Sequence, residues 1–439
     1  MSEKKYFNIP DDWEYRGEGN CHLVLGLPKM KTVLRIRKKD KPKNIMQWFL
    51  YLVGNYLPWW KKDGEAAERR DLNLYLRVMR PFFGLSFTAN ALYVRLSKKQ
   101  MKKIESQLDN LRPDFRKCKV LDIERACLFE DLTYMTPEVA DIYSIEIKPK
   151  KAWAPATERE FPECIFCMNQ YLKLKNGKIS KRSKYCPKDL FSGDEYKMKK
   201  AISALIADPQ NNFRIFKNGR IVYDENKTEN EVDPILEELF DDHVENREEM
   251  INEFVHMIYK CLTKPMATKT KCTAQAFCVW DLALHGRDLP KGCVLEKILS
   301  AQMIDMEGAS FYNNLLNDNC PDWDYIERLM ENLDLTVCVK CFLRALSYSR
   351  RITNDSYGVA VYIISAIASD CSVMLTMNRK TNQENIVEEA ENNIVTTKYG
   401  SYQVKIGVLD LGPKPASTIT KHHLRNKELL ALMLENGKK

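Results

Sequence analysis

The chain has 439 residues and a net charge of +8, from 68 basic and 60 acidic side chains. This length is more than one ordinary core fills, so we expect two or three lobes, with a cleft between lobes as the default binding site. The mild basic excess does not by itself indicate a protein that binds nucleic acid.

The cysteines and the apolar segments bear on the cellular compartment in which the protein is expected. The chain has 14 cysteines, and residues 1–10 show no apolar segment of the kind that secretory signal peptides contain. We therefore expect reduced thiols, as in cytosolic or nuclear proteins. The longest apolar segments, such as residues 358–368, are shorter than the roughly 20 residues that cross a bilayer. These features predict a soluble protein of the cytoplasm, the nucleus or both, with no membrane span. Separately, we expect a monomer.

The first 140 residues predict a small β-rich lobe with packed helices. Two apolar runs separated by a turn lie between residues 13 and 39, with Gly17 and Gly19 where the first run begins, which indicates a hairpin. Apolar residues then recur at helical spacing over 44–56 and 65–80. Further strands are expected at 91–96, 126–129 and 142–148.

Beyond residue 155 the pattern is mainly helical. Helices are expected over 163–174, 196–207, 234–240, 247–262, 295–303 and 322–349. Asn218-Gly219 joins two short strands, 213–216 and 220–223, in a hairpin. Later strands are expected at 357–367, 372–377 and 403–410, and residues 264–273 and 378–393 have the polar composition of loops.

Three lysines are gathered around a proline in the stretch EIKPKK, residues 146–151. Pro149 fixes its own φ and biases Lys148 toward extended backbone, so Lys148 and Lys150 become rigidly spaced cations. A solvated strand end would have the same composition. The stretch 173–188 adds seven basic residues and no carboxylate, which favours an anionic ligand.

The glycine-containing stretch RGEGN, residues 16–20, resembles a phosphate-binding turn. In kinase-like lobes, backbone amides of such a turn approach phosphates and a cation on a neighbouring strand holds them, a part that Arg35 fits. Any tight turn also recruits glycine, so this stretch alone leaves both interpretations open.

Two carboxylates, Asp370 and Asp410, lie beside apolar strand-like runs. Phosphoryl transfer needs one carboxylate to accept the hydroxyl proton and another to hold Mg²⁺. Turn capping at a strand end is the alternative for each. The sequence has no His-Arg-Asp or Asp-Phe-Gly run, so an ordinary protein kinase is disfavoured.

Taken together, six ordered motifs resemble the inositol-pentakisphosphate 2-kinase family. They are RGEGN at 16–20, EIKPK at 146–150, YCPKDLFSG at 185–193, QNNFRIFKNG at 210–219, SDCSVML at 369–375 and VLDLGPKP at 408–415. The resemblance implies an α/β (α+β) two-lobed kinase-like fold, with an N-lobe over 1–140 and a larger, helix-rich C-lobe over 141–439. It also implies ATP- and Mg²⁺-dependent phosphorylation of inositol 1,3,4,5,6-pentakisphosphate at the 2-hydroxyl, giving inositol hexakisphosphate. A non-catalytic inositol-polyphosphate or RNA-binding module is the alternative.

The resemblance also implies roles for individual residues. Asp370 would be the general base and Asp410 the Mg²⁺ ligand. The nucleotide would contact Gly17, Glu18, Gly19, Asn20, Arg35 and Glu146. The substrate phosphates would contact Arg112, Lys148, Lys150, Lys173, Asn212, Arg214 and Lys414. These cations suit the task because lysine and arginine make charge-assisted hydrogen bonds to phosphate.

Several positions depart from the family pattern. Asn169 stands where a histidine is expected, and Ala152-Trp153-Ala154 replaces a Gly-Phe-Leu-like run. Beyond Lys414, the expected basic and tyrosine positions read Ala416, Thr418 and His422. Peripheral phosphate contacts are therefore expected to be missing or rebuilt.

Two cysteine groups have spacings found in zinc sites. Cys164 and Cys167 lie three residues apart, with Cys186 further on, and Cys338 and Cys341 have the same short spacing. Neither group shows a fourth ligand at conventional spacing. Packing of buried thiols within helices is the alternative to structural zinc.

Overall fold

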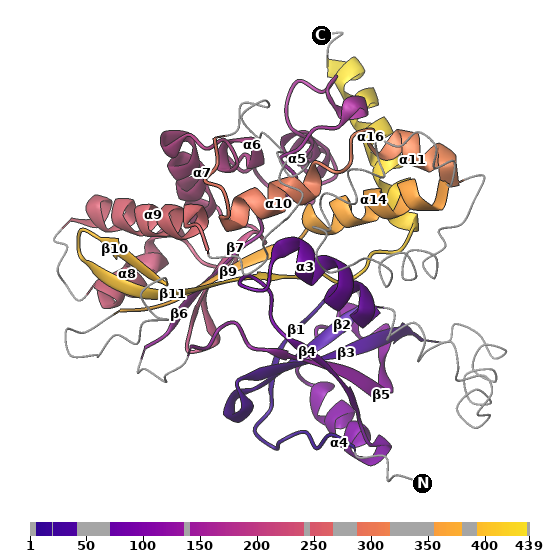
Figure 1. Ribbon diagram of the computed structural model, residues 1–439, viewed down its shortest axis with the longest axis vertical. Helices are drawn as coiled ribbons and strands as arrows, with labels where there is room; N and C mark the ends of the chain where they lie inside the picture. The colour runs from indigo at the N-terminus through magenta and orange to yellow at the C-terminus, as the bar shows by residue number, and fades with distance from the viewer. Residues whose placement is uncertain are drawn as a thin grey trace, which may run out of the picture. The chain divides into compact units, whose positions relative to one another are not determined.

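Extended apolar segments pair into two antiparallel sheets, one in each of two units of the chain (Figure 1). The computed structural model describes residues 6–19, 21–41, 71–135, 141–240, 246–266, 288–316, 355–379 and 393–436. One unit comprises residues 1–76 and 89–131, and the other comprises residues 77–88 and 132–439. The predicted mixed α/β class is confirmed.

Some predicted segments lie outside the described residues. These are the helices expected over 44–56 and 322–349, the first part of 65–80, residue Asn20, and most of the loops expected over 264–273 and 378–393. In the described ranges no helix combines the length and the apolar character that a bilayer span requires.

The first unit is a five-stranded sheet in the order β1-β2-β3-β5-β4. Its strands are β1 (Glu14–Glu18), β2 (His22–Leu27), β3 (Thr32–Asp40), β4 (Ala91–Arg95) and β5 (Lys119–Glu130). The predicted hairpin is confirmed as β2 and β3, joined through the short helix η1 (Pro28–Met30). A short helical turn of this unit is η3 (Asp114–Arg116), and the π-helical η2 (Leu74–Met79) begins in this unit and ends in the second.

One helix of the first unit, α4 (Lys98–Leu108), was not expected from the sequence. Ser97 caps its start by accepting a hydrogen bond of 3.2 Å from the Gln100 amide. Met101, Ile104 and Leu108 are buried and share a core with strand residues of the sheet. Lysines between these three positions obscure the apolar stripe in the sequence.

The second unit has a six-stranded sheet in the order β10-β11-β9-β6-β7-β8. Its strands are β6 (Tyr143–Ile147), β7 (Phe213–Lys217), β8 (Arg220–Tyr223), β9 (Ser372–Arg379), β10 (Ile394–Thr397) and β11 (Gly400–Leu409). The hairpin β7–β8 is as predicted. Asn218 and Gly219 both have positive φ, of 49° and 76°, which the Asn-Gly pair tolerates in a two-residue turn.

The helices of the second unit include all those predicted within the described residues. They are α3 (Arg80–Phe83), α5 (Ile165–Lys175), α6 (Pro187–Leu190), α7 (Glu195–Ala207), α8 (Asp233–Phe240), α9 (Arg247–Thr263), α10 (Val294–Gln302), α11 (Ala309–Leu316), α14 (Asp355–Ala368) and α16 (Ser417–Asn436), with the turns η4 (Ala156–Glu158) and η5 (Glu229–Val232). Figure 1 shows α9, α10 and α14 following one another, and α10 contacts both α9 and α14.

The strand predicted over 357–367 is wrong, because these residues form most of α14. The segment is rich in β-branched residues, yet its 14 residues exceed a usual strand length. Helices α10, α11 and α16 all contact α14, so side chains such as Val359, Ile363 and Ile367 are buried completely. A helix buried on several sides has no polar face, and its sequence therefore resembles that of a buried strand.

Candidate functional site

The register of the second sheet brings four chain segments to one edge. The end of β6, Ile147, pairs with the start of β7 at Phe213 and with Val373 near the start of β9. Leu409, at the end of β11, pairs with Ser372. The residues that follow β6 and β11, and those that precede β7 and β9, therefore meet at this edge, which we call the charged edge.

At the charged edge, Asp370 is held between two lysines. Lys150 Nζ lies 3.3 Å from Asp370 Oδ1, and Lys414 Nζ lies 2.7 Å from Oδ2. The three residues are far apart in the sequence and all belong to the second unit. The carboxylate keeps 55% of its side-chain surface exposed, so a ligand can reach it.

The two lysines control the ionisation of Asp370. Burial raises the pKa of its carboxyl, but the attraction of Lys150 and Lys414 and their hydrogen bonds outweigh this and lower the pKa to about 2. Burial lowers the pKa of the Lys150 ammonium, which Asp370 partly offsets. Three charges that share one small region are therefore mutually dependent, and an anionic ligand that binds the lysines will alter the carboxylate.

Asp410 lies directly after β11 and has a left-handed backbone, with φ of 61°. Aspartate tolerates this conformation better than most residues. Ser372 Oγ is 3.5 Å from Asp410 Oδ2. Because Ser372 pairs with Leu409 in the β9–β11 ladder, Asp370, which lies two residues before Ser372, is at the same edge as Asp410. Two exposed carboxylates at adjacent strand ends offer hard oxygen donors of the kind that suit a divalent cation such as Mg²⁺.

The Lys148–Lys150 segment is fixed through its backbone. The Lys148 amide donates to the Asn212 carbonyl at 2.8 Å, and the Tyr185 hydroxyl donates to the Pro149 carbonyl at 2.6 Å. Lys150 has a left-handed φ of 59°, which costs roughly 1–2 kcal/mol for a residue with a side chain. The surrounding hydrogen bonds therefore maintain a strained conformation that presents the lysine to Asp370.

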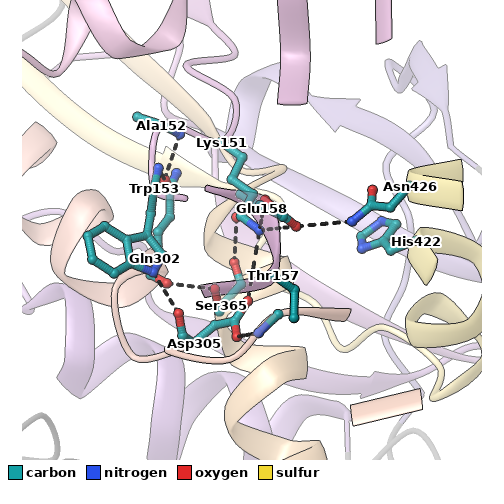
Figure 2. Close-up of polar contacts among 12 residues, drawn as sticks. Lys151, Ala152, Trp153, Thr157, Glu158, Gln302, Asp305, Ser365, His422 and Asn426 are labelled. Atoms are coloured by element: carbon teal, nitrogen blue, oxygen red, sulfur yellow. Dashed lines mark hydrogen bonds and ion pairs between the residues drawn. The ribbon is translucent and has the colours of Figure 1, made fainter. Parts of the chain in front are cut away.

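Gln302, which the sequence analysis did not identify, braces this segment (Figure 2). Its Oε1 accepts hydrogen bonds from the amides of Ala152 and Trp153, at 2.9 and 3.3 Å. Its Nε2 donates to the carbonyls of Lys150 and Ala368, at 2.9 and 3.3 Å. The fully buried side chain of Gln302 thus connects residues 150–153 with Ala368 at the end of α14, two positions before Asp370.

A cavity of about 220 Å³ opens beside the charged edge. Four predicted site residues line it: Lys150, Lys173, Asp370 and Lys414. Further charged residues of the lining were not predicted: Lys151, Asp305 and Arg425. The lining has five cationic side chains and two carboxylates, so the cavity suits a compact polyanion.

A buried ion network includes two residues of the cavity lining, Lys151 and Asp305 (Figure 2). Lys151 Nζ donates to both carboxylate oxygens of Glu158, at 2.8 and 2.9 Å, and lies 3.8 Å from Asp305 Oδ2. Asn426 donates to Glu158 at 3.4 Å. Burial raises the pKa of Asp305 to about 6, although Lys151 opposes this effect. Lys151 is therefore paired with Glu158 and Asp305, whereas Lys150 and Lys414 are paired with Asp370.

Helix α16 supplies the cavity with two residues, His422 and Arg425. His422 Nδ1 is 2.8 Å from the Tyr362 hydroxyl, and burial lowers the pKa of its imidazole to about 3, so it is neutral at physiological pH. Arg425 donates to the side chain of its neighbour Asn426, at 3.1 and 3.3 Å. Burial lowers the pKa of Arg425 somewhat, with Glu158 opposing this effect. The guanidinium is a desolvated cation facing the cavity.

Other predicted ligands of the second unit lie at the charged edge but not in the cavity lining. Arg214 Nη2 is 3.0 Å from Glu225, and Arg214 Nη1 is 4.0 Å from Glu146, its pairing partner on β6. Asn212 is buried, and among the described residues its Oδ1 has no hydrogen-bond partner. A ligand that contacts Arg214 would therefore compete with carboxylates.

In the first unit, Glu18 and Arg112 bind each other. Arg112 donates from Nε and Nη2 to the two Glu18 oxygens at 2.8 and 2.9 Å, and Lys38, which was not predicted, donates to the same carboxylate. Burial raises the pKa of Glu18, but the hydrogen bonds from both cations outweigh it and lower the pKa. A phosphate contact by Arg112 would have to displace this buried pair.

The glycine stretch itself has backbone features of a tight turn. Gly17 has a φ of 138°, a conformation open to glycine, and its pairing in β1 is shifted by a bulge. The Gly19 amide donates to the His22 carbonyl at 2.9 Å. Arg35 lies on β3, where it pairs with Cys127 of β5, and its guanidinium is 5.4 Å from the centre of the Phe129 ring. Its predicted nucleotide contact stays a prediction.

Comparison with known proteins agrees with this chemistry. The sequence model of the family described as inositol-pentakisphosphate 2-kinase matches residues 15–428. An inositol-pentakisphosphate 2-kinase from Danio rerio is 26% identical, in an alignment that covers 97% of this chain and 94% of the relative. One from Arabidopsis thaliana is 26% identical over 96% and 92%, and one from Drosophila melanogaster is 24% identical over 57% and 54%. The chain belongs to the inositol-pentakisphosphate 2-kinase family.

Proposed function

We propose that this chain transfers the γ-phosphoryl group of ATP to the 2-hydroxyl of inositol 1,3,4,5,6-pentakisphosphate, giving inositol hexakisphosphate. The observation that carries the proposal is Asp370, an accessible carboxylate held between Lys150 and Lys414 in a cation-lined cavity. A site built only to bind anions gains nothing from a carboxylate among its cations, because like charge opposes the ligand. A reaction that removes a proton from a hydroxyl uses a positioned base, and the Asp370 carboxylate can provide one.

The substrate itself would activate the base. Phosphates that bind Lys150 and Lys414 draw these cations away from Asp370, so the pKa of its carboxyl rises from about 2 toward the range of a useful proton acceptor. Lys173, on α5, adds a third cation to the same cavity. Asp370 would thus be a weak base in the free protein and a stronger one in the substrate complex.

Membership of a kinase family implies use of ATP and of a divalent metal ion. We assign the metal to Mg²⁺ and its protein ligand to Asp410, whose exposed carboxylate provides the oxygen donor that this cation prefers. When bound, the ion would neutralise charge that develops on the phosphates. Gly17, Gly19, Arg35 and Glu146 remain the proposed nucleotide contacts, Lys148, Asn212 and Arg214 remain proposed contacts of the substrate phosphates, and the chain is proposed to act in the cytoplasm or nucleus.

The test is an assay of pentakisphosphate conversion in which each phosphate position of the product is resolved. Wild-type chain with ATP and Mg²⁺ should give the hexakisphosphate, and Asp370→Asn should bind the pentakisphosphate without converting it. Tight pentakisphosphate binding by the wild type with no ATP-dependent product, at any Mg²⁺ concentration, would instead indicate the non-catalytic module. Phosphorylation of a different ring position would refute the proposed regiochemistry.

A further inference from the structure

Asp305 is a buried carboxylate of the cavity lining, and one of its two oxygens is unpaired. Its Oδ1 accepts the Gly308 amide at 2.8 Å, and its backbone carbonyl accepts the Trp153 indole at 2.6 Å. Its Oδ2 is buried and has no hydrogen-bond partner in the part of the chain that the structure describes. Such an oxygen is costly in a folded protein, so its presence requires an explanation.

Lys151 is shared between two carboxylates and does not fully compensate the charge of Asp305 (Figure 2). The short contacts of its ammonium, at 2.8 and 2.9 Å, are both with Glu158, whereas Asp305 Oδ2 is 3.8 Å away. A distance of 3.8 Å is longer than a hydrogen bond. The cluster therefore holds two carboxylates and one ammonium, and Asp305 is the less well paired of the two carboxylates.

Three further titratable groups, from α14 and α16, lie around this cluster. Tyr362 is neutral, because burial and the charges of Asp305 and Glu158 raise the pKa of its hydroxyl. His422 is neutral as well, because burial lowers the pKa of its imidazole to about 3. The Arg425 guanidinium is attracted to Glu158. The surplus negative charge of the cluster thus remains on Asp305.

A ligand that carries phosphates brings more negative charge into the same cavity. Lys150, Lys173 and Lys414 line this cavity together with Asp305, so phosphates bound by these lysines also act on the Asp305 carboxyl. A nearby like charge disfavours the ionised form of a carboxyl. Burial already raises the pKa of Asp305 to about 6, with Lys151 opposing this effect, so a rise of one unit brings it to neutral pH. Protonation also gives the carboxyl a hydrogen-bond donor.

We propose that Asp305 takes up a proton from solution when the pentakisphosphate enters the cavity, so that substrate binding is coupled to protonation of this buried carboxyl. The inference rests on the proposed function, because it takes the pentakisphosphate as the ligand. Asp370 and Asp305 then have opposite roles in one cavity: the first is the accessible base, and the second is a neutral acid in the substrate complex. Environments that push the pKa values of two carboxyls apart are a recurrent means of separating such roles.

The affinity of Asp305→Asn for the pentakisphosphate, measured from pH 5 to pH 8, tests the coupling. The amide is neutral at every pH and stands for the protonated carboxyl. At pH 5 we therefore expect wild type and variant to bind equally. At pH 8 the variant should bind about 10-fold more tightly for each unit by which the ligand raises the pKa of Asp305. Protonation of the substrate's own phosphates affects both proteins alike. Asp288→Asn removes a surface carboxylate and should follow wild type throughout.

Proton uptake can also be counted without comparing affinities. Binding calorimetry at pH 7 in buffers of different ionisation enthalpy should show more protons taken up by wild type than by Asp305→Asn, with a difference of up to about one. Glu158→Gln leaves Asp305 intact but removes the neighbouring carboxylate and frees Lys151 to pair with Asp305. In that variant the uptake due to Asp305 should move to lower pH. Wild type and Glu158→Gln carry the test if Asp305→Asn does not fold.

Other outcomes would refute the coupling. If the affinities of wild type and Asp305→Asn kept a constant ratio from pH 5 to pH 8, or if the variant bound more weakly at every pH, Asp305 would have only a structural role. Proton uptake that is the same in wild type, Asp305→Asn and Glu158→Gln would have the same meaning. Each of these results leaves the proposed function intact, because the pentakisphosphate still binds. A wild type that does not bind the pentakisphosphate at any pH would refute both the coupling and the proposed function.

Discussion

Asp370 shows how neighbouring charges set the function of one carboxyl group. Its partners Lys150 and Lys414 keep the pKa at about 2, far below that of an effective proton acceptor at neutral pH. Both lysines are also the proposed ligands of substrate phosphates. In the proposed reaction, binding and activation would therefore be the same event, because the cations that attract the substrate would release the base when they bind its phosphates.

Replacing Asp370 by Asn should separate catalysis from binding. The amide keeps the shape but cannot accept the hydroxyl proton, so turnover should fall by at least about 10²-fold. Affinity for the pentakisphosphate should stay the same or increase, because Lys150 and Lys414 lose an ion-pair partner that competes with phosphate. Calorimetric binding and single-turnover rates measure the two effects. Near wild-type turnover would remove Asp370 from the role of base.

Asp305 should give stability an unusual pH dependence. Burial raises the pKa of its carboxyl in the folded chain from 3.8 to about 6, so the folded state binds more protons than the unfolded state between these values. Stability that Asp305 contributes below about pH 4 is therefore lost as the pH rises toward 6. From the size of this shift, the loss is on the order of 2–3 kcal/mol.

The variant Asp305→Asn cannot titrate and should lack this loss, although its Oδ1 can still accept the Gly308 amide. Urea unfolding of wild type and variant at pH 4 and pH 7 measures the difference between their pH dependences. Asp288→Asn, on the surface, is the control for removing a negative charge. If the unfolding free energies of wild type and Asp305→Asn changed equally between pH 4 and pH 7, the raised pKa assigned to Asp305 would be contradicted.

At the scale of elements, the sequence predicted segments with a clear local signal. The β7–β8 hairpin follows from Asn218-Gly219, and α9 from its apolar spacing. α14 was predicted as a strand because burial on several sides removes the polar face that distinguishes a helix. α16 was not predicted, and with it Arg425 was missed as part of the cavity, whereas His422 was named only as a departure from the family pattern.

Gln302 of α10 is hydrogen-bonded to α14 and to the Lys148–Lys150 segment. Gln302→Leu should therefore destabilise the packing between these three parts of the chain. The substitution leaves two amides and two carbonyls without this partner, each costing about 1–3 kcal/mol when buried and unpaired. We expect a loss of at least about 3 kcal/mol in unfolding free energy, with lower turnover. Gln302→Glu keeps the acceptor for the amides and should be intermediate. Equal stability of Gln302→Leu and wild type would show that the brace is dispensable.

The basic and tyrosine positions that the family pattern expects after Lys414 read Ala416, Thr418 and His422 in this chain, and Arg425 of α16 offers a replacement cation in the cavity lining. Removing a charge-assisted contact to phosphate costs about 1.5–3 kcal/mol, so Arg425→Met should weaken pentakisphosphate binding about 10- to 100-fold. Lys421→Met, on the exposed side of the same helix, removes the same charge and should have little effect. Equal effects of the two variants would attribute the loss to net charge alone.

At the scale of the whole molecule, the sheet explains why motifs far apart in the sequence form one site. Residue types at Lys150, Asp370 and Lys414 indicated phosphate chemistry, and antiparallel register then places them at one edge. Register and long-range ion pairs cannot be read from spacing, so neither the Lys151–Glu158 network nor the Glu18–Arg112 pair was foreseen. Both pairs join residues whose local sequence gives no signal of their partner.

The net charge of +8 raises the question of whether the chain attracts polyanions generally or binds one compact ligand. Lys173 lines the cavity, whereas Lys178, Lys181, Arg182 and Lys184 are exposed beyond the end of α5. Burial lowers the pKa of the Lys173 ammonium, and Lys150 adds to this effect. A phosphate that pairs with Lys173 therefore relieves unfavourable charge, while the exposed cations contribute mainly attraction that salt screens.

Lys173→Met should accordingly weaken pentakisphosphate binding about 10- to 100-fold, at low and at physiological salt alike. Replacing the four exposed cations together by Gln removes four times the charge, yet should reduce affinity only several-fold at low salt and less at physiological salt. Titration calorimetry of both variants at two salt concentrations distinguishes the cases, with single-stranded RNA as a second ligand. Should the four-site variant lose more pentakisphosphate affinity than Lys173→Met, or should RNA bind tightly and the pentakisphosphate not at all, the cavity would not be the binding site and the basic surface would be.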